Sequence, residues 1–121
     1  RDCLLSRGLG DVYKRQLKDC DKNQLTMNVC ASHRYATADQ KLNQQYKQLM
    51  AQQDATGKQR LRDAQRAWIS FRDKDCLANT GLREESGSIW PLLHYSCLER
   101  HTSQRSEDLK LQACGMEGCG K

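Results

Sequence analysis

The stretch MNVCASHRYATADQKLNQQYKQL, residues 27–49, decides the fold class of this chain. Apolar or small residues recur in it at positions 27, 31, 35, 38, 42, 46 and 49, and the positions between them are mostly polar. Steps of three and four residues place side chains on one face of an α-helix. The stretch therefore predicts a long amphipathic helix over residues 24–54, which Gly57 helps to end.

Two further helices are expected to pack against the first. The second spans residues 58–76, and the third spans residues 89–111, where His101 and Arg105 interrupt the apolar stripe. Residues 77–88 are polar and contain two glycines, so we predict a loop between these helices. Neighbouring helices pack antiparallel, so the expected fold is all-α, a three-helix antiparallel bundle. The buried stripe of the second helix should contain Leu61, Ala64, Trp68 and Phe71, followed by Arg72 or Asp75.

The composition fits one small helical domain that does not span a membrane. The chain has 121 residues, 29% of them charged, and no apolar run reaches the ~20 residues that a transmembrane helix requires. Seven cysteines in so short a chain predict a disulfide framework that forms in an oxidising compartment. We therefore expect a periplasmic or secreted protein.

Residues 1–16 have a different character from the rest of the chain. They carry six charges and no apolar stretch as long as a signal peptide, and we interpret them as a non-native or disordered leader. Setting them aside removes Cys3 and leaves six cysteines, an even number. The leader contributes +2 of the formal charge of +5, so the remainder carries +3. This mild charge, without basic runs or interleaved aromatic residues, argues against nucleic acid as a partner.

The remainder divides into a helical domain and a short tail. We place the helical domain at residues 17–113 and assign residues 114–121 to a tail rich in glycine and cysteine. The tail contains too many glycines to continue a helix.

Short motifs occur in a fixed order along the chain. They are NVCA at 28–31, AQRAW at 64–68, FRD at 71–73 and GSI at 87–89, framed by Cys30, Cys76 and Cys97. As an ordered set they resemble the lysozyme inhibitor LprI family of small bacterial envelope proteins, over residues 20–111. The resemblance implies an exported, non-enzymatic binding protein whose target is lysozyme. The alternative is an envelope structural or interaction protein without lysozyme activity.

The six remaining cysteines can pair in many ways. Sequence proximity and the family resemblance favour two bridges, Cys20 with Cys30 and Cys76 with Cys97. Cys114 with Cys119 is then left by elimination.

A metal site and an enzymatic site are the competing chemical interpretations. His94, Cys97 and His101 lie three and four residues apart, a spacing that would put three zinc ligands on one helix face. Zinc would also need a fourth donor and a reduced thiolate, so we expect no metal or other cofactor. No histidine falls in a recognised nucleophile signature, and we expect no enzymatic activity.

The loop at 77–88 is the best candidate for recognition. A polar loop whose ends are held by a disulfide presents side chains at a low cost in ordering entropy. Arg83 could approach the paired carboxylates of a glycosidase cleft, and Glu84 and Glu85 could meet a positive surface. We therefore predict that the protein is a monomer and that this loop binds a protein partner, lysozyme. The alternative is that the loop only connects the two helices and faces solvent. The candidate contact residues are Arg83, Glu84, Glu85 and Ser86.

Overall fold

The computed structural model describes residues 19–115, and in this part of the chain the predicted all-α class is confirmed. The leader at 1–16 and Cys119 lie outside the described residues, so the domain boundaries proposed from the sequence stay predictions. The elements are α2 (Gln24–Ala51), α3 (Ala55–Thr80), the short α4 (Arg83–Ser86), a 3-10 turn (Gly87–Ile89) and α5 (Trp90–Cys114).

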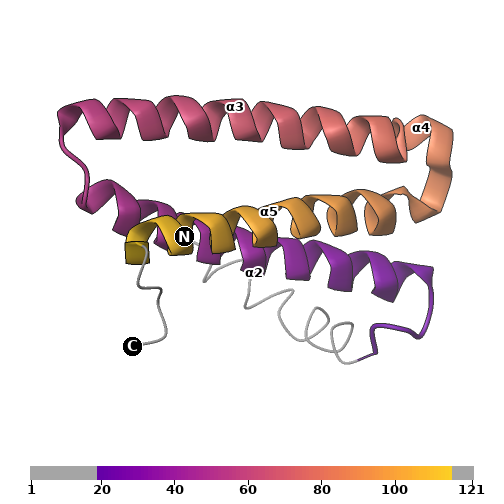
Figure 1. Ribbon diagram of the computed structural model, residues 1–121. Coiled ribbons are helices and arrows are strands. Elements are labelled where there is room, and N and C mark those ends of the chain that lie inside the picture. The colour runs from indigo at the N-terminus through magenta and orange to yellow at the C-terminus, as the bar shows by residue number, and fades with distance from the viewer. Residues whose placement is uncertain (1–18, 116–121) are drawn as a thin grey trace, which may run out of the picture.

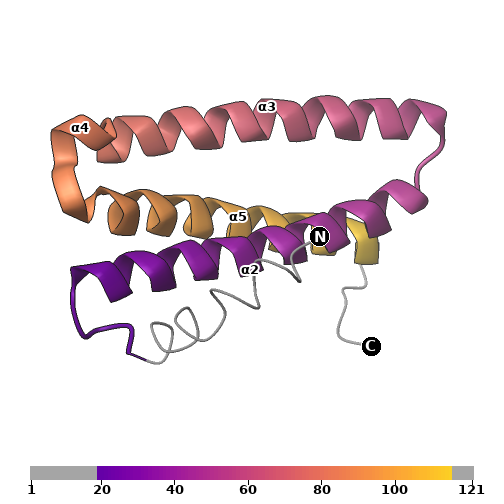
Figure 2. The ribbon, with the colours of Figure 1, turned by 180° about the vertical axis from the view of Figure 1, so that it is seen from behind.

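The long helices run in alternating directions along the chain, as expected, but they do not pack evenly. Helices α2 and α5 lie side by side and run in the same direction (Figure 1), and the opposite view agrees (Figure 2). Helix α3 runs antiparallel to both, contacts mainly α5 and barely touches α2. The expected bundle is therefore a close pair of helices with a third that stands off from α2.

Helix α2 begins at the predicted residue but ends at Ala51 instead of residue 54, and Gly57, which was expected to help end it, lies in the first turn of α3. Its first turn is closed by a reciprocal capping box: the Thr26 amide donates to Asn23 Oδ1 over 2.9 Å, and the Asn23 amide donates to Thr26 Oγ1 over 3.0 Å. The predicted face is confirmed, because the residues at 31, 38, 42 and 49 are buried and those at 27, 35 and 46 are partly buried. Local periodicity was enough to predict the start and the buried face of this helix.

Helix α3 shows the main error of the sequence analysis. Ala64 and Phe71 were predicted to be buried, but Ala64 is exposed and 58% of Phe71 is accessible to solvent. The face that is turned inward is rotated by about one residue, and its buried members are partly polar. They are Leu61, Gln65, Arg72, Cys76 and Thr80.

Helix α5 also differs from its predicted stripe. Buried positions are 97, 98, 102, 106 and 109, two of which are the small polar residues Thr102 and Ser106. Small buried residues occur on α2 as well, at Ala31 and Ala38, which lets the two backbones approach closely. The helix continues past the predicted end at residue 111 to Cys114, where Gly115 adopts a positive φ of 68°.

Two clusters form the core, and two disulfides lie towards the end of the molecule that contains the start of α2 and the connection from α3 to α5. Leu42, Leu49, Leu61 and Leu109 make one cluster, and the bridged pair Cys76 and Cys97 makes the other with Leu98. The two predicted bridges, Cys20–Cys30 and Cys76–Cys97, are both confirmed. Cys114 is also disulfide-bonded, but its predicted partner lies outside the described residues. Among the described helices, none is both long and apolar enough to cross a bilayer.

Candidate functional site

The connection between α3 and α5 is ordered and largely helical, so the predicted loop at 77–88 needs correction. Helix α3 continues to Thr80, and the Gly81 amide closes its last turn by donating to the Leu77 carbonyl over 2.8 Å. The Thr80 hydroxyl also donates to the Cys76 carbonyl. Gly81 and Gly87 have φ angles of 69° and 70°, which let the chain turn before and after α4. Polar composition alone did not reveal these turns.

Hydrogen bonds fix the connection from inside. Glu85 Oε1 accepts from the Leu82 amide over 2.7 Å, and the Ser86 hydroxyl donates to the Thr80 carbonyl over 2.7 Å. The Trp90 indole N–H donates to the Gly81 carbonyl over 2.9 Å. The Cys76–Cys97 bridge closes the base of the connection. Its backbone is therefore held before any partner arrives.

These bonds divide the four predicted contact residues into two pairs. Glu85 and Ser86 use their side chains to support the backbone, although Glu85 is exposed, as Arg83 and Glu84 are. Arg83 lines a shallow hollow of about 310 Å³ with Ser88 and Pro91. Asn28 of α2 borders the same hollow and donates its side-chain amide to the Ser88 carbonyl over 2.9 Å.

Exposed apolar side chains gather along the connection and its flanking turns. Leu77, Leu82, Ile89 and Leu93 are each at least 40% exposed, and all four fall within residues 77–93. Figure 1 shows that the connection lies at the same end of the molecule as the start of α2. Grouped apolar residues on a small protein's surface are typical of interaction sites. The structure thus adds apolar groups to a surface that the sequence analysis described only by its charges.

The two histidines of the metal-site alternative, which the sequence analysis did not favour, make other contacts. His94 stacks on Trp90 with ring centroids 4.2 Å apart, and its Nδ1 lies 3.3 Å from the Thr80 hydroxyl. Burial lowers the pKa of His94, and Arg72 adds to this effect while Asp73 opposes it.

His101 does not join His94 in a cluster. Its Nε2 pairs with Asp75 Oδ2 over 2.7 Å. In the described part of the chain, the group with ligand atoms within 4.8 Å of one another is Cys76, Cys97 and His101. Since the two sulfurs are bonded to each other, the oxidised protein does not offer them as thiolates.

A polar layer lies beneath α3, formed by residues of the AQRAW and FRD motifs. Arg72 is buried, pairs with Asp73 over 2.9 Å and donates to the Thr102 hydroxyl over 3.4 Å. Its guanidinium carbon lies 5.1 Å from the centre of the Trp68 ring. Arg105 of α5 lies 6.0 Å from the centre of the same ring and donates its Nε–H to Gln65 Oε1 over 3.0 Å. The inward motif residues therefore satisfy one another.

Comparison with known proteins matches these motifs to one family. The family model for lysozyme inhibitor LprI matches residues 18–109. This chain belongs to the LprI family. It is 36% identical over 107 residues to an uncharacterized protein of Rhizobium meliloti (strain 1021), with 76% of each chain covered. No solved structure matches it.

In this LprI family member, a groove of about 510 Å³ lies between α2 and α3, where α3 stands off. Tyr35, Tyr46 and Trp68 supply aromatic walls, and Arg62 and Arg66 line the α3 side. Sequence reasoning missed this groove because it assigned both tyrosines to the core stripe of α2. The spacing of the arginines on α3 was the available signal, but it does not reveal how far α3 lies from α2.

Proposed function

We propose that this protein is an exported, non-enzymatic binding protein that inhibits lysozyme. Membership of the lysozyme inhibitor LprI family over residues 18–109 is the observation that carries the proposal. Disulfides at Cys20–Cys30 and Cys76–Cys97 support folding in an oxidising compartment, the periplasm or the extracellular space. The protein acts as a monomer that offers one surface to its partner.

The contact surface in this proposal is the connection from α3 to α5. It combines exposed apolar residues, Leu82 and Ile89, with the exposed charges of Arg83 and Glu84. An apolar centre with a polar rim is the usual composition of a protein interface. The connection is held by hydrogen bonds and by the Cys76–Cys97 bridge, so little ordering entropy is lost on binding. Arg83 is positioned to meet the carboxylates of a glycosidase cleft.

A second candidate is an envelope interaction protein without lysozyme activity. The formal charge of +3 that remains without residues 1–16 favours it, because a mildly basic protein gains no long-range attraction towards the strongly basic lysozymes of animals. The same connection would then bind a different protein. Inhibition of lysozyme by this protein depends on local complementarity of shape and charge at the contact surface.

An assay of cell-wall lysis by lysozyme separates the two candidate functions. Lysis is measured with increasing amounts of the oxidised protein. Saturable inhibition at a fixed stoichiometry is the expected result. No inhibition at high micromolar protein would favour the interaction protein.

Variants then test the contact surface. Joint replacement Arg83→Ala and Glu84→Ala should weaken inhibition at least tenfold, about 1.4 kcal/mol, without changing the helical circular dichroism. Glu85→Gln retains an acceptor for the Leu82 amide and tests the charge of Glu85 apart from its structural bond. The matched control replaces Arg66 and Glu107, which are exposed on the long helices, by alanine. Equal inhibition by both double variants would exclude the connection as the contact surface.

A further inference from the structure

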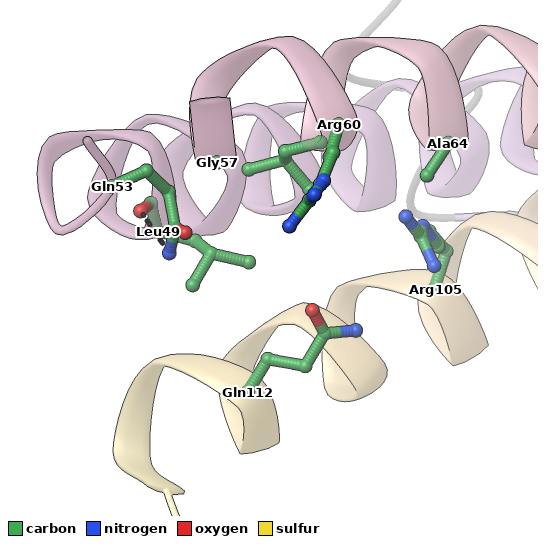
Figure 3. A pocket seen from close by; sticks show the side chains of 8 residues that line it. Leu49, Gln53, Gly57, Arg60, Ala64, Arg105 and Gln112 are labelled. Atoms are coloured by element: carbon green, nitrogen blue, oxygen red, sulfur yellow. Dashed lines mark hydrogen bonds between the residues drawn. The ribbon is translucent and has the colours of Figure 1, made fainter. Parts of the chain in front are cut away.

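A second hollow lies at the end of the molecule opposite the connection, between the start of α3 and the end of α5. Its volume is about 330 Å³. Figure 3 shows Arg60 of α3 and Arg105 of α5 directing their guanidinium groups into it, with the amide of Gln112 between them. Leu49 and Leu61, both members of the core, form its apolar side. The hollow therefore combines two cations, an amide and an apolar floor.

The positive charge of this hollow has no counter-ion among its walls. The described residues that line it include no carboxylate. In the described part of the chain, the ion pairs join Arg34 to Glu99, Arg72 to Asp73 and His101 to Asp75. Arg60 and Arg105 take part in none of them.

Three carboxylates on the neighbouring elements accept other hydrogen bonds. Asp54 caps α3 by accepting from the Gly57 amide over 2.7 Å. Asp108 accepts from the Gln104 amide over 3.2 Å, although its charge still favours the protonated form of Arg105. Asp63 accepts from Gln59 on the exposed side of α3.

Arg105 is held in place and partly removed from water. Its Nε–H is used by Gln65, and its guanidinium carbon lies 6.0 Å from the centre of the Trp68 ring. Burial lowers its pKa, since a cation loses hydration there without gaining an ion pair. A guanidinium has five N–H donors in a planar fork that matches a carboxylate. The terminal nitrogens of Arg105 are thus preorganised donors at the edge of the hollow.

We propose that this hollow binds a small organic carboxylate, held between Arg60 and Arg105, with its apolar part on Leu49 and Leu61. A carboxylate would supply the missing counter-charge, and charge-assisted hydrogen bonds to arginine are among the stronger polar contacts. The volume accommodates a ligand of about ten non-hydrogen atoms, at roughly 30 Å³ for each. Gly57 of the first turn of α3 also lines the hollow, but its amide already donates to Asp54, so the arginines supply the attraction for the carboxylate.

This site is separate from the surface proposed to contact lysozyme. The hollow is at the end formed by the α2–α3 turn, and the connection is at the other end (Figure 1). Carboxylate binding does not rest on the proposed function, so either proposal can fail alone.

Titration of the full oxidised chain, followed by amide chemical shifts in nuclear magnetic resonance, tests the site. Hexanoate and hexylammonium have the same number of carbon atoms and opposite charges. N-acetyl-leucine and its uncharged amide form a second matched pair, which presents the carboxylate as at a peptide terminus. We expect saturable shifts at residues 57–64 and 105–112 with a carboxylate and none with hexylammonium or the amide. Hexanoate alone would identify an alkyl acid as the ligand, and N-acetyl-leucine alone would identify a peptide terminus.

Two charge-removing variants on the same helix make the test specific. Arg60→Gln should weaken carboxylate binding at least tenfold, because it removes one side of the clamp while leaving the Arg105 contacts intact. Arg62→Gln removes the same charge from α3 but lies outside this hollow, so it should change binding less than twofold. Arg105→Gln should also weaken binding. Because this variant also loses the hydrogen bond to Gln65, its unfolding curve should be measured to check that it is still folded.

Several results would overturn the site. Equal effects of Arg60→Gln and Arg62→Gln would reduce the binding to general surface charge. Equal binding of hexanoate and hexylammonium would remove the role of the arginines. Inorganic phosphate binding as tightly as hexanoate would remove the role of the apolar floor. Unsaturable shifts would show that no site exists.

Discussion

Removing the Cys76–Cys97 disulfide should destabilise the protein more than removing Cys20–Cys30. The first bridge spans a sequence separation of 21 residues and the second a separation of 10. If a disulfide acts by restricting the unfolded chain, these loops correspond to about 3.3 and about 2.7 kcal/mol at room temperature. Cys76 and Cys97 are 0% and 3% exposed, so their replacement also removes core contacts. We expect a loss of about 4 kcal/mol for Cys76→Ala with Cys97→Ala.

The assay is urea unfolding of both double-alanine variants, followed by the helical circular dichroism without reductant. A domain of this size loses about 4 °C in Tm for each kcal/mol, so the Cys76→Ala with Cys97→Ala variant should melt about 15 °C lower. Alanine is used because serine would bury an unpaired hydroxyl and add a separate cost. The wild-type protein with reduced thiols provides a second reference for the effect of the bridges.

The two variants differ in their expected effect on function. The Cys76–Cys97 bridge holds the connection, whereas Cys20–Cys30 ties the segment before α2 to that helix. Inhibition of lysozyme at a temperature where both variants are folded should weaken only when the first bridge is absent. A smaller loss of stability for Cys76→Ala with Cys97→Ala than for Cys20→Ala with Cys30→Ala would refute the reasoning.

Two further predictions concern packing and pH. Trp68 is half-buried and has two guanidinium groups near its ring, so Trp68→Ala should lower the free energy of unfolding in urea by about 3 kcal/mol. The Phe71 side chain is 58% exposed, so Phe71→Ala should lower it by less than about 1 kcal/mol. Equal losses of unfolding free energy for the two variants would show that Phe71 is as buried as Trp68, as the sequence predicted. Burial lowers the pKa of His94, so the unfolded chain binds its proton more readily and stability falls as the pH drops below about 6.5. The His94→Gln variant should therefore lose less stability than the wild type between pH 7.5 and pH 5. Equal losses in the two proteins would show that His94 does not cause the pH dependence.

The sequence predicted those features that depend on local chemistry. The start and the buried face of helix α2 were predicted correctly because its apolar spacing is a local pattern, whereas its capping box was not predicted. The two disulfides were predicted with help from the family resemblance, and both are present. The class of α3 was also correct, although its start at Ala55 and its end at Thr80 lie beyond the predicted limits.

The register of α3 was predicted wrongly because its inner face is stabilised by contacts that are distant in sequence. Hydrophobicity placed Phe71 inside and gave no reason to bury Gln65. The partner of Gln65 is Arg105, 40 residues away, and Arg72 reaches Thr102 across 30 residues. A sequence pattern does not reveal that such groups will satisfy each other, so polar residues on a buried face look like solvent-facing ones.

The contact residues proposed from the sequence were chosen by charge, and the structure shows why charge alone is insufficient. Glu85 and Ser86 hold backbone groups, so they shape the connection and leave Arg83 and Glu84 exposed for contact. The exposed apolar residues near them, such as Leu82 and Ile89, were hidden in the sequence because a polar loop was expected there. Exposure depends on the turns at Gly81 and Gly87, which place these side chains.

The polar layer beneath α3 also explains the hollows of this small protein. Trp68, Arg72 and Arg105 are too large and too polar to pack as closely as the small residues between α2 and α5. They keep α3 away from α2 and leave space on both sides, the groove beside Trp68 and the hollow beside Arg105. An all-apolar inner face on α3 would pack more tightly, and replacing buried polar groups in this way is often stabilising. The groove and the hollow therefore depend on polar side chains whose burial the hydrophobic pattern of the sequence did not predict.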